Sequence, residues 1–158
     1  MILYRGLLLC AALLAGPATA DRINLPADMP ASYPSECGSC HLPFPPSLLS
    51  ADDWRKTMAG LERHFGTDAS LEAKESQVIS AWLTRHAGRR PASGEKTPRI
   101  TTAAWFVREH DEVPARIWRD ERIKSAANCA ACHRGANQGR YGEGELDVPG
   151  LGRHHEGH

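Results

Sequence analysis

The chain has 158 residues, and its 19 basic residues balance its 19 acidic residues. This length accommodates one or two small domains, and the neutral balance gives no electrostatic attraction toward nucleic acid or an anionic membrane surface. Aromatic residues make up only 6% of the chain, while Gly and Pro number 14 and 11. Side chains alone would fill a core poorly, and a large apolar cofactor would relieve that shortage.

The first twenty residues have the layout of a cleavable secretory signal. Arg5 supplies an early positive charge, an apolar run covers residues 7–15, and small residues occupy positions 18–20. The apolar run is too short to span a membrane. We therefore expect residues 1–20 and Cys10 to be removed, and the mature protein to be exported to the periplasm without a membrane span.

The next part of the chain, residues 21–87, is predicted to form an N-terminal domain with two helices. Ser50 and Asp53 resemble a capping box, and an apolar stripe follows before Gly66, formed by Trp54, Met58, Leu61 and Phe65. A second helix over about residues 71–87 aligns four more apolar side chains before Gly88, namely Leu71, Val78, Ile79 and Trp82.

Residues 88–99, GRRPASGEKTPR, are charged and rich in Gly and Pro, which is typical of a linker. Residues 100–158 are then predicted to form a C-terminal domain. Thr101 or Thr102 can cap a helix that Pro114 limits, residues 117–123 favour a short helix, and the glycine-rich tail after His133 is expected to be irregular. Since no segment sustains a period-two alternation, few or no strands are expected.

The pattern C-x-x-C-H occurs twice, as CGSCH at 37–41 and as CAACH at 129–133. Two thiols at this spacing can add to the two vinyl groups of a haem, and the adjacent histidine can then bind the iron. We therefore predict two covalently bound haem c groups in a mainly α fold, a small helical c-type cytochrome with two haem-bearing halves and long irregular loops. The predicted residues are Cys37, Cys40 and His41 for haem 1, and Cys129, Cys132 and His133 for haem 2.

Three other uses of the cysteines compete with this interpretation. A zinc site could use all four, a thioredoxin-like redox pair would need a βαβ context that the chain lacks, and disulfides across such short loops would be strained. None of these explains a histidine directly after the second cysteine in both copies.

The residue on the far side of each iron decides what a haem can do. Methionine raises the reduction potential, a second histidine lowers it, and a vacant position admits small ligands. Met58 lies on an apolar helical stripe and is expected to pack in the core. His64, in LERHFG, lies at the edge of the same stripe, and we predict that it binds the iron of haem 1.

For haem 2, helical geometry leaves His86 and His110 as contenders. His86 falls at the end of its helix beside the linker, where solvent exposure is an alternative role. His110 lies in the same half as CAACH, and its helix carries Trp105 and Phe106, which can pack against a porphyrin. The pattern favours His110. The closing RHHEGH is expected to be a flexible polar tail, because HEGH lacks the spacing of the H-E-x-x-H zinc motif.

Four segments carry a resemblance to a known family: CGSCH, LERHFGTDAS, PRITTAAWFVREHDEVP and SAANCAACHRGA. Together they resemble the exported dihaem cytochrome c family. The resemblance implies two low-potential haems with two histidine ligands each, and an electron-transfer role. By position it makes His64 the sixth ligand of haem 1 and His110 that of haem 2, while His86 matches nothing in the pattern. It also implies protein partners, namely a small oxygen-binding c-type haem protein as acceptor and a membrane cytochrome b as donor.

Two further functions remain open at the level of the sequence. A small dihaem peroxidase or reductase would need one open or displaceable iron position and a nearby acid–base group. A gas-sensing module would need a vacant iron and a signalling partner domain. The predicted function is electron transfer without catalysis, since one histidine is available for each iron.

Overall fold

The structure, a computed structural model, describes residues 22–92 and 97–151. The predicted signal peptide and the histidine-rich end at 152–158 lie outside the described residues. Within them, the chain forms short α-helices and 3-10 helices, with isolated β-bridges in place of strands. The prediction of a mainly α fold is thus confirmed. Within the same ranges, no helix is both long and apolar enough to cross a membrane.

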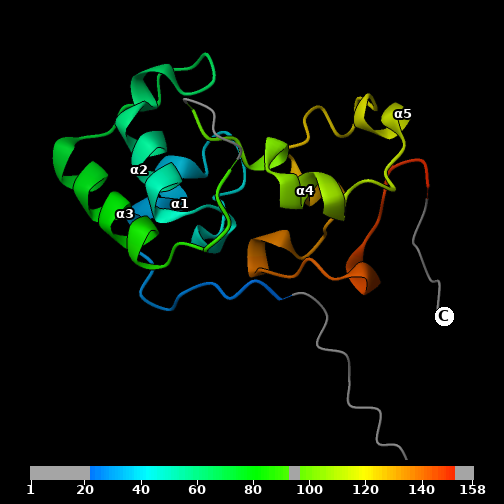
Figure 1. Cartoon of the computed structure of the whole chain (residues 1–158), viewed down its shortest axis with the longest axis horizontal. Helices are drawn as coiled ribbons and strands as arrows, with labels where there is room; N and C mark the ends of the chain where they lie inside the picture. The colour runs from blue at the N-terminus through cyan, green and yellow to red at the C-terminus, as the bar shows by residue number, and fades with distance from the viewer. Residues whose placement is uncertain (1–21, 93–96, 152–158) are drawn as a thin grey trace, which may run out of the picture.

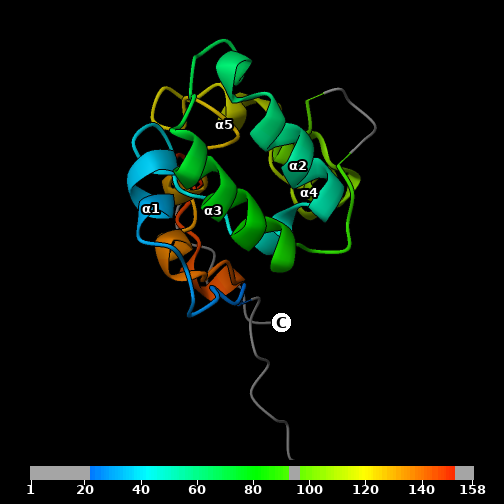
Figure 2. The same ribbon diagram turned by 90° about the vertical axis from the view of Figure 1, so that its left-hand side faces the viewer.

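The helices gather into two lobes, which lie side by side in Figure 1. The first lobe holds α1 (Ser32–Cys37), α2 (Ala51–Ala59) and α3 (Ala73–Arg85), and Figure 2 shows α2 and α3 packed next to each other. The second lobe holds α4 (Ala104–Glu109) and α5 (Ala115–Trp118). Within the described ranges, six 3-10 helices lie between these elements or after α5, at Pro46–Leu48, Leu61–Arg63, Ile100–Thr102, Cys129–Ala131, Ala136–Gln138 and Glu143–Glu145.

The start of α2 is as predicted, but its end is not. The hydroxyl of Ser50 accepts a hydrogen bond from the Asp53 amide at 3.2 Å and caps the helix. The helix ends at Ala59 instead of continuing toward Gly66, because Gly60 ends it and the chain turns into a 3-10 helix. Phe65, predicted on the apolar stripe, is 44% exposed and has a positive φ of 51°.

Helix α3 buries Ile79, Trp82 and Leu83 against the rest of the first lobe. The predicted stripe was wrong at Val78, which is 45% exposed, because the buried face turns from Ile79 toward Leu83. Met58 packs against the same core, as predicted.

The helices of the second half are shorter than predicted. Helix α4 begins at Ala104 and has Ala103 at its N-cap, because Thr102 lies in a 3-10 turn and its hydroxyl donates to the Arg99 carbonyl at 3.1 Å. Neither predicted threonine cap is therefore correct. The expected helix at 117–123 is the short α5, and beyond it Ile123 packs in a small apolar cluster without helical structure.

The main apolar core draws on both predicted halves. Ile100, Ala103 and Phe106 belong to the same buried cluster as Trp54 and Trp82. The N-terminal segment (residues 22–30), which precedes α1, also connects the two lobes. It extends from α1 to the second lobe (Figure 1), where the Ile23 amide donates to the Gly139 carbonyl at 2.8 Å. The division into two haem domains at 88–99 stays a prediction.

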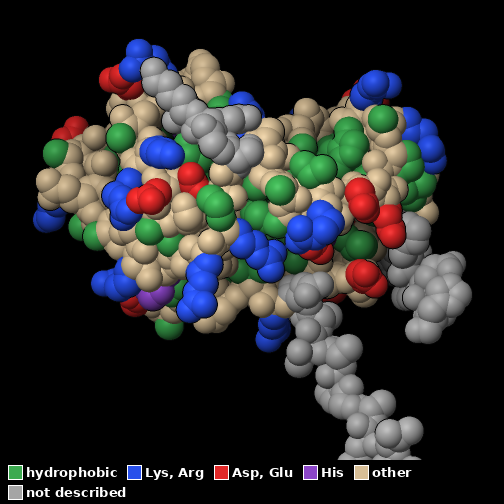
Figure 3. Space-filling model, in the orientation of Figure 1, with side chains coloured by type: hydrophobic (Ala, Val, Ile, Leu, Met, Phe, Trp, Pro, Cys, Tyr) green, Lys and Arg blue, Asp and Glu red, His purple; other side chains and the backbone are tan. Residues whose placement is uncertain are grey.

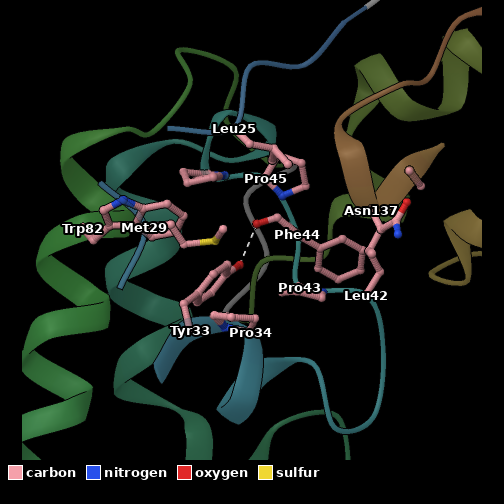
Figure 4. Close-up of a pocket in the computed structure, with 12 residues that line it drawn as sticks. Leu25, Met29, Tyr33, Pro34, Leu42, Pro43, Phe44, Pro45, Trp82 and Asn137 are labelled. Atoms are coloured by element: carbon pink, nitrogen blue, oxygen red, sulfur yellow. Dashed lines mark hydrogen bonds between the residues drawn. The ribbon is translucent and has the colours of Figure 1, made fainter. Parts of the chain in front are cut away.

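A cavity of about 210 Å³ lies at the seam between the lobes. Figure 4 shows Leu25 and Met29 of the N-terminal segment on one side, and Asn137 of the second lobe on another. The hydroxyl of Tyr33 donates to the Phe44 carbonyl at 2.6 Å along one wall. The N-terminal segment therefore closes one side of an apolar space between the lobes.

Candidate haem sites

The first C-x-x-C-H motif begins at the end of α1. Cys37 is the last helical residue and Gly38 is the C-cap. A Cβ on Gly38 would lie 2.2 Å from the Pro34 carbonyl oxygen, so only glycine fits this tight exit from the helix. The exit turns the chain so that His41 faces the loop that follows α2.

His41 and His64 face each other across the first site. Their ring centroids are 6.2 Å apart, and the ring planes are inclined by 34°. The Nδ1 atom of His41 lies 2.7 Å from the Leu42 carbonyl oxygen, and since a carbonyl only accepts, Nδ1 must carry the proton. The Nε2 atom of His41 is then left with its lone pair. Phe44 stacks on the ring at 4.7 Å and fixes its orientation.

His110 and His133 form an equivalent pair at the second site. Their ring centroids are 6.1 Å apart, but the planes are nearly perpendicular, at 81°. His110 is the C-cap of α4, and its Nδ1–H donates to the Phe106 carbonyl at 2.8 Å. The ring of Phe106 also stacks on it at 4.0 Å, so both the backbone and the side chain of Phe106 hold the ring of His110.

His133 is set by the irregular chain after the second motif. Its amide donates to the Cys129 carbonyl at 2.8 Å, and the Tyr141 ring lies 5.2 Å away. The Tyr141 backbone favours the protonated ring of His133, but the contact falls short of hydrogen-bond geometry, and Nδ1 is buried without a partner. Burial lowers the pKa of His133, and it also lowers the pKa of His64. Both rings are thus favoured in the neutral form that binds iron.

The arrangement of the cysteines weighs against a zinc site. Burial raises the pKa of Cys37 to about 11 and that of Cys129 to about 11, which favours the protonated thiols. The four cysteines of the described ranges form no disulfide. In those ranges, no group of three or more His, Cys, Asp or Glu side chains is arranged to hold a metal ion.

The spacing of the histidine pairs fits an iron between the rings. With metal–nitrogen bonds of about 2.0 Å and a ring centre ~1.1 Å beyond each nitrogen, two imidazoles on opposite sides of one metal have centroids roughly 6.2 Å apart. The two pairs have 6.2 and 6.1 Å. The donor sets and spacing therefore fit a haem at each motif.

His86, the competing candidate for the second iron, lies elsewhere. Its Nε2 atom is 2.9 Å from a carboxylate oxygen of Asp28, and its ring lies 5.8 Å from Trp82. These contacts join the end of α3 to the N-terminal segment in the first lobe. The structure brings His110, and not His86, to His133.

A sequence model described as dihaem cytochrome c matches residues 33–141. The chain belongs to the dihaem cytochrome c family. A dihaem cytochrome c from Shewanella baltica is 39% identical, with a TM-score of 0.70 over 79% of this chain and 98% of that chain. One from Rhodobacter sphaeroides is 37% identical, with a TM-score of 0.64 over 75% of this chain and 100% of that chain. No curated protein sequence matches.

Membership of the dihaem cytochrome c family carries two covalently attached haem c groups and an electron-carrier role. The two predicted haems are therefore confirmed. Which side chains bind each iron stays a prediction, which the paired rings support.

Sequence reasoning missed the side chains that hold these histidines in place. Phe44 follows CGSCH by three residues, and its aromatic character beside a proline run is the only signal that it packs on His41. The composition of residues 88–99 predicts a linker, yet the guanidinium of Arg99 lies 4.1 Å from the centre of the Phe65 ring next to His64. A contact between segments so far apart in the sequence leaves no local pattern.

Proposed function

We propose that this dihaem cytochrome c passes single electrons in the periplasm through two low-potential haems, each held by two histidines. The observation that carries the proposal is the opposition of His41 to His64 and of His110 to His133, at 6.2 and 6.1 Å. With both sides of an iron occupied, no position is open to a substrate.

The residues of the chain have separate tasks in this proposal. The thiols of Cys37 and Cys40, and those of Cys129 and Cys132, attach the two haems, and each bound iron takes up or releases one electron. The Leu42 and Phe106 carbonyls hold the rings of His41 and His110 through Nδ1, which keeps Nε2 available and makes these rings better donors. Two neutral imidazoles on each iron favour a low potential.

We further propose a membrane cytochrome b as the electron donor and a small oxygen-binding c-type haem protein as the acceptor, on the strength of the family resemblance. The face in Figure 3 carries basic and acidic side chains with hydrophobic ones scattered among them. Such a mixed surface suits brief encounters with protein partners better than permanent assembly.

Carbon monoxide tests whether both irons are saturated. We expect the Soret band of the dithionite-reduced holoprotein to stay unchanged on addition of the gas, because neither iron has a free position. His64→Ala and His110→Ala are positive controls, each of which should bind carbon monoxide at one haem. A clear band shift in the unsubstituted protein would contradict the carrier proposal and favour a small dihaem peroxidase or reductase with one open iron.

A further inference from the structure

A cation lies beside the first histidine pair. The guanidinium carbon of Arg99 is 4.1 Å from the centre of the Phe65 ring, within the range of a cation–π contact. The Phe65 ring in turn lies 4.8 Å from the ring of His64, in an edge-to-face arrangement. Among the residues that the structure describes, no carboxylate pairs with Arg99.

The backbone conformation of Phe65 indicates that its contact with Arg99 is functional. Phe65 has a φ of 51°, in the left-handed region that bulky residues avoid. Its side chain is 44% exposed, so burial in the core does not explain the strained conformation. Strained backbone of this kind gathers at functional positions. The strained turn places an aromatic face between His64 and Arg99.

The contact at the first site has no counterpart at the second. Phe65 lies between the Arg99 guanidinium, 4.1 Å from its ring centre, and the His64 ring, 4.8 Å away. The rings around His110 and His133 are those of Phe106, Trp118 and Tyr141, and in the described ranges no cation lies over any of them. The two sites therefore differ by one cation held against a ring beside a predicted iron ligand.

We propose that the guanidinium of Arg99, held over Phe65, stabilises the reduced state of haem 1 and raises its reduction potential relative to that of haem 2. Reduction transfers one electron from an external donor to the iron, which goes from ferric to ferrous, so the site loses one positive charge. A nearby fixed cation favours the state of lower charge. The inference rests on the proposed function, because it requires His64 to face the iron of haem 1.

The two haems can be followed separately in one experiment. Ring planes inclined by 34° at the first site and by 81° at the second split the iron orbitals differently. The nearly perpendicular pair keeps two of these orbitals close in energy and gives a more anisotropic ferric EPR signal. A potentiometric titration of the holoprotein, with dithionite as reductant and EPR as readout, then yields one midpoint potential for each haem.

Four variants separate the charge of Arg99 from other effects. We expect Arg99→Gln to lower the midpoint potential of haem 1 and to leave haem 2 unchanged. Arg99→Lys keeps the positive charge, so the midpoint potential of haem 1 should stay close to that of the unsubstituted protein. Phe65→Leu removes the ring that holds the guanidinium and should lower the potential of haem 1 in the same direction as Arg99→Gln. Arg90→Gln, which removes an exposed charge from the same chain segment, should change neither potential.

Unchanged potential of haem 1 in Arg99→Gln, with both low-spin signals at full intensity, would overturn the inference. An equal shift in Arg90→Gln would also overturn it, because the effect would then belong to net charge. Failure of the proposed function has a different signature: haem 1 of the unsubstituted protein would give a high-spin ferric signal and bind carbon monoxide.

Discussion

At each site the chain holds one histidine by its Nδ1–H and leaves the other more loosely fixed. Phe106 holds His110 twice, by its carbonyl at 2.8 Å and by its ring at 4.0 Å. A hydrogen bond to Nδ1 selects the tautomer whose Nε2 can bind iron. Because residues 106 and 110 are one helical turn apart, α4 itself sets the direction in which His110 points.

The distal ligand of haem 2 is the sharpest test at the residue scale. We expect His110→Ala to replace the more anisotropic low-spin EPR signal with a high-spin signal, because the iron loses one imidazole. His86→Ala is the matched control: it removes a histidine that contacts Asp28, and it should leave both low-spin signals intact. High-spin iron in His86→Ala alone would show that the assignment is wrong.

The haem motifs were predictable from the sequence, because the chemistry that defines C-x-x-C-H lies within five consecutive residues. The pairing of His64 with His41 was predictable as a hypothesis, since a haem in the first half needs a ligand from that half. The position of Arg99 was not predictable, because the composition of a linker does not indicate which aromatic ring its arginine will contact.

At the scale of the elements, a buried network fixes the start of α2. Asp53 is 5% exposed, and its carboxylate accepts from the Ser50 hydroxyl at 2.6 Å and from the Ala92 amide at 2.8 Å. The cap was predictable because Ser and Asp at this spacing are a local signal. The bond to Ala92 was not, since it joins α2 to the segment after α3.

We expect Asp53→Ala to lower the free energy of unfolding by about 2–4 kcal/mol, because it removes the carboxylate that accepts from the Ser50 hydroxyl and leaves the buried Ala92 amide without an acceptor. Asp52→Ala is the control, since Asp52 lies on the exposed side of α2 in a surface pair with Arg55. It should cost less than about 1 kcal/mol. Urea unfolding of the holoprotein followed by far-ultraviolet circular dichroism measures both, and equal losses would contradict the network.

The end of α2 shows why the boundaries of helices could not be predicted from the sequence. Phe65 follows Leu61 at the spacing of one helical face. The same spacing in the sequence also occurs where a helix ends and the chain reverses direction in a turn. Gly60 and Gly66 can both end a helix, and contacts formed in the folded chain end α2 at Gly60. One such contact is the Ala69 amide, which donates to the Leu61 carbonyl at 2.9 Å and closes the turn that carries His64.

At the scale of the whole molecule, two connections hold the lobes together. The main core takes Ile100, Ala103 and Phe106 from beyond the predicted linker. The N-terminal segment crosses the seam and is held at one end by Asp28, whose carboxylate pairs with Arg85 at 2.7 Å. A chain with few aromatic residues thus shares its main apolar core between the two lobes.

The second-lobe end of this segment depends on Gly139. Its φ of 71° is left-handed, and a Cβ there would lie 2.1 Å from the Ile23 carbonyl oxygen. We expect Gly139→Ala to displace the segment, to break the bond from the Ile23 amide and to lower the free energy of unfolding by about 1–3 kcal/mol. The Ile23 amide should then exchange with deuterium much faster. Gly144→Ala lies in the same lobe with nothing within 4 Å of its Cβ, and it should leave that exchange unchanged. Slow exchange of Ile23 in Gly139→Ala would show that other contacts hold the segment across the seam.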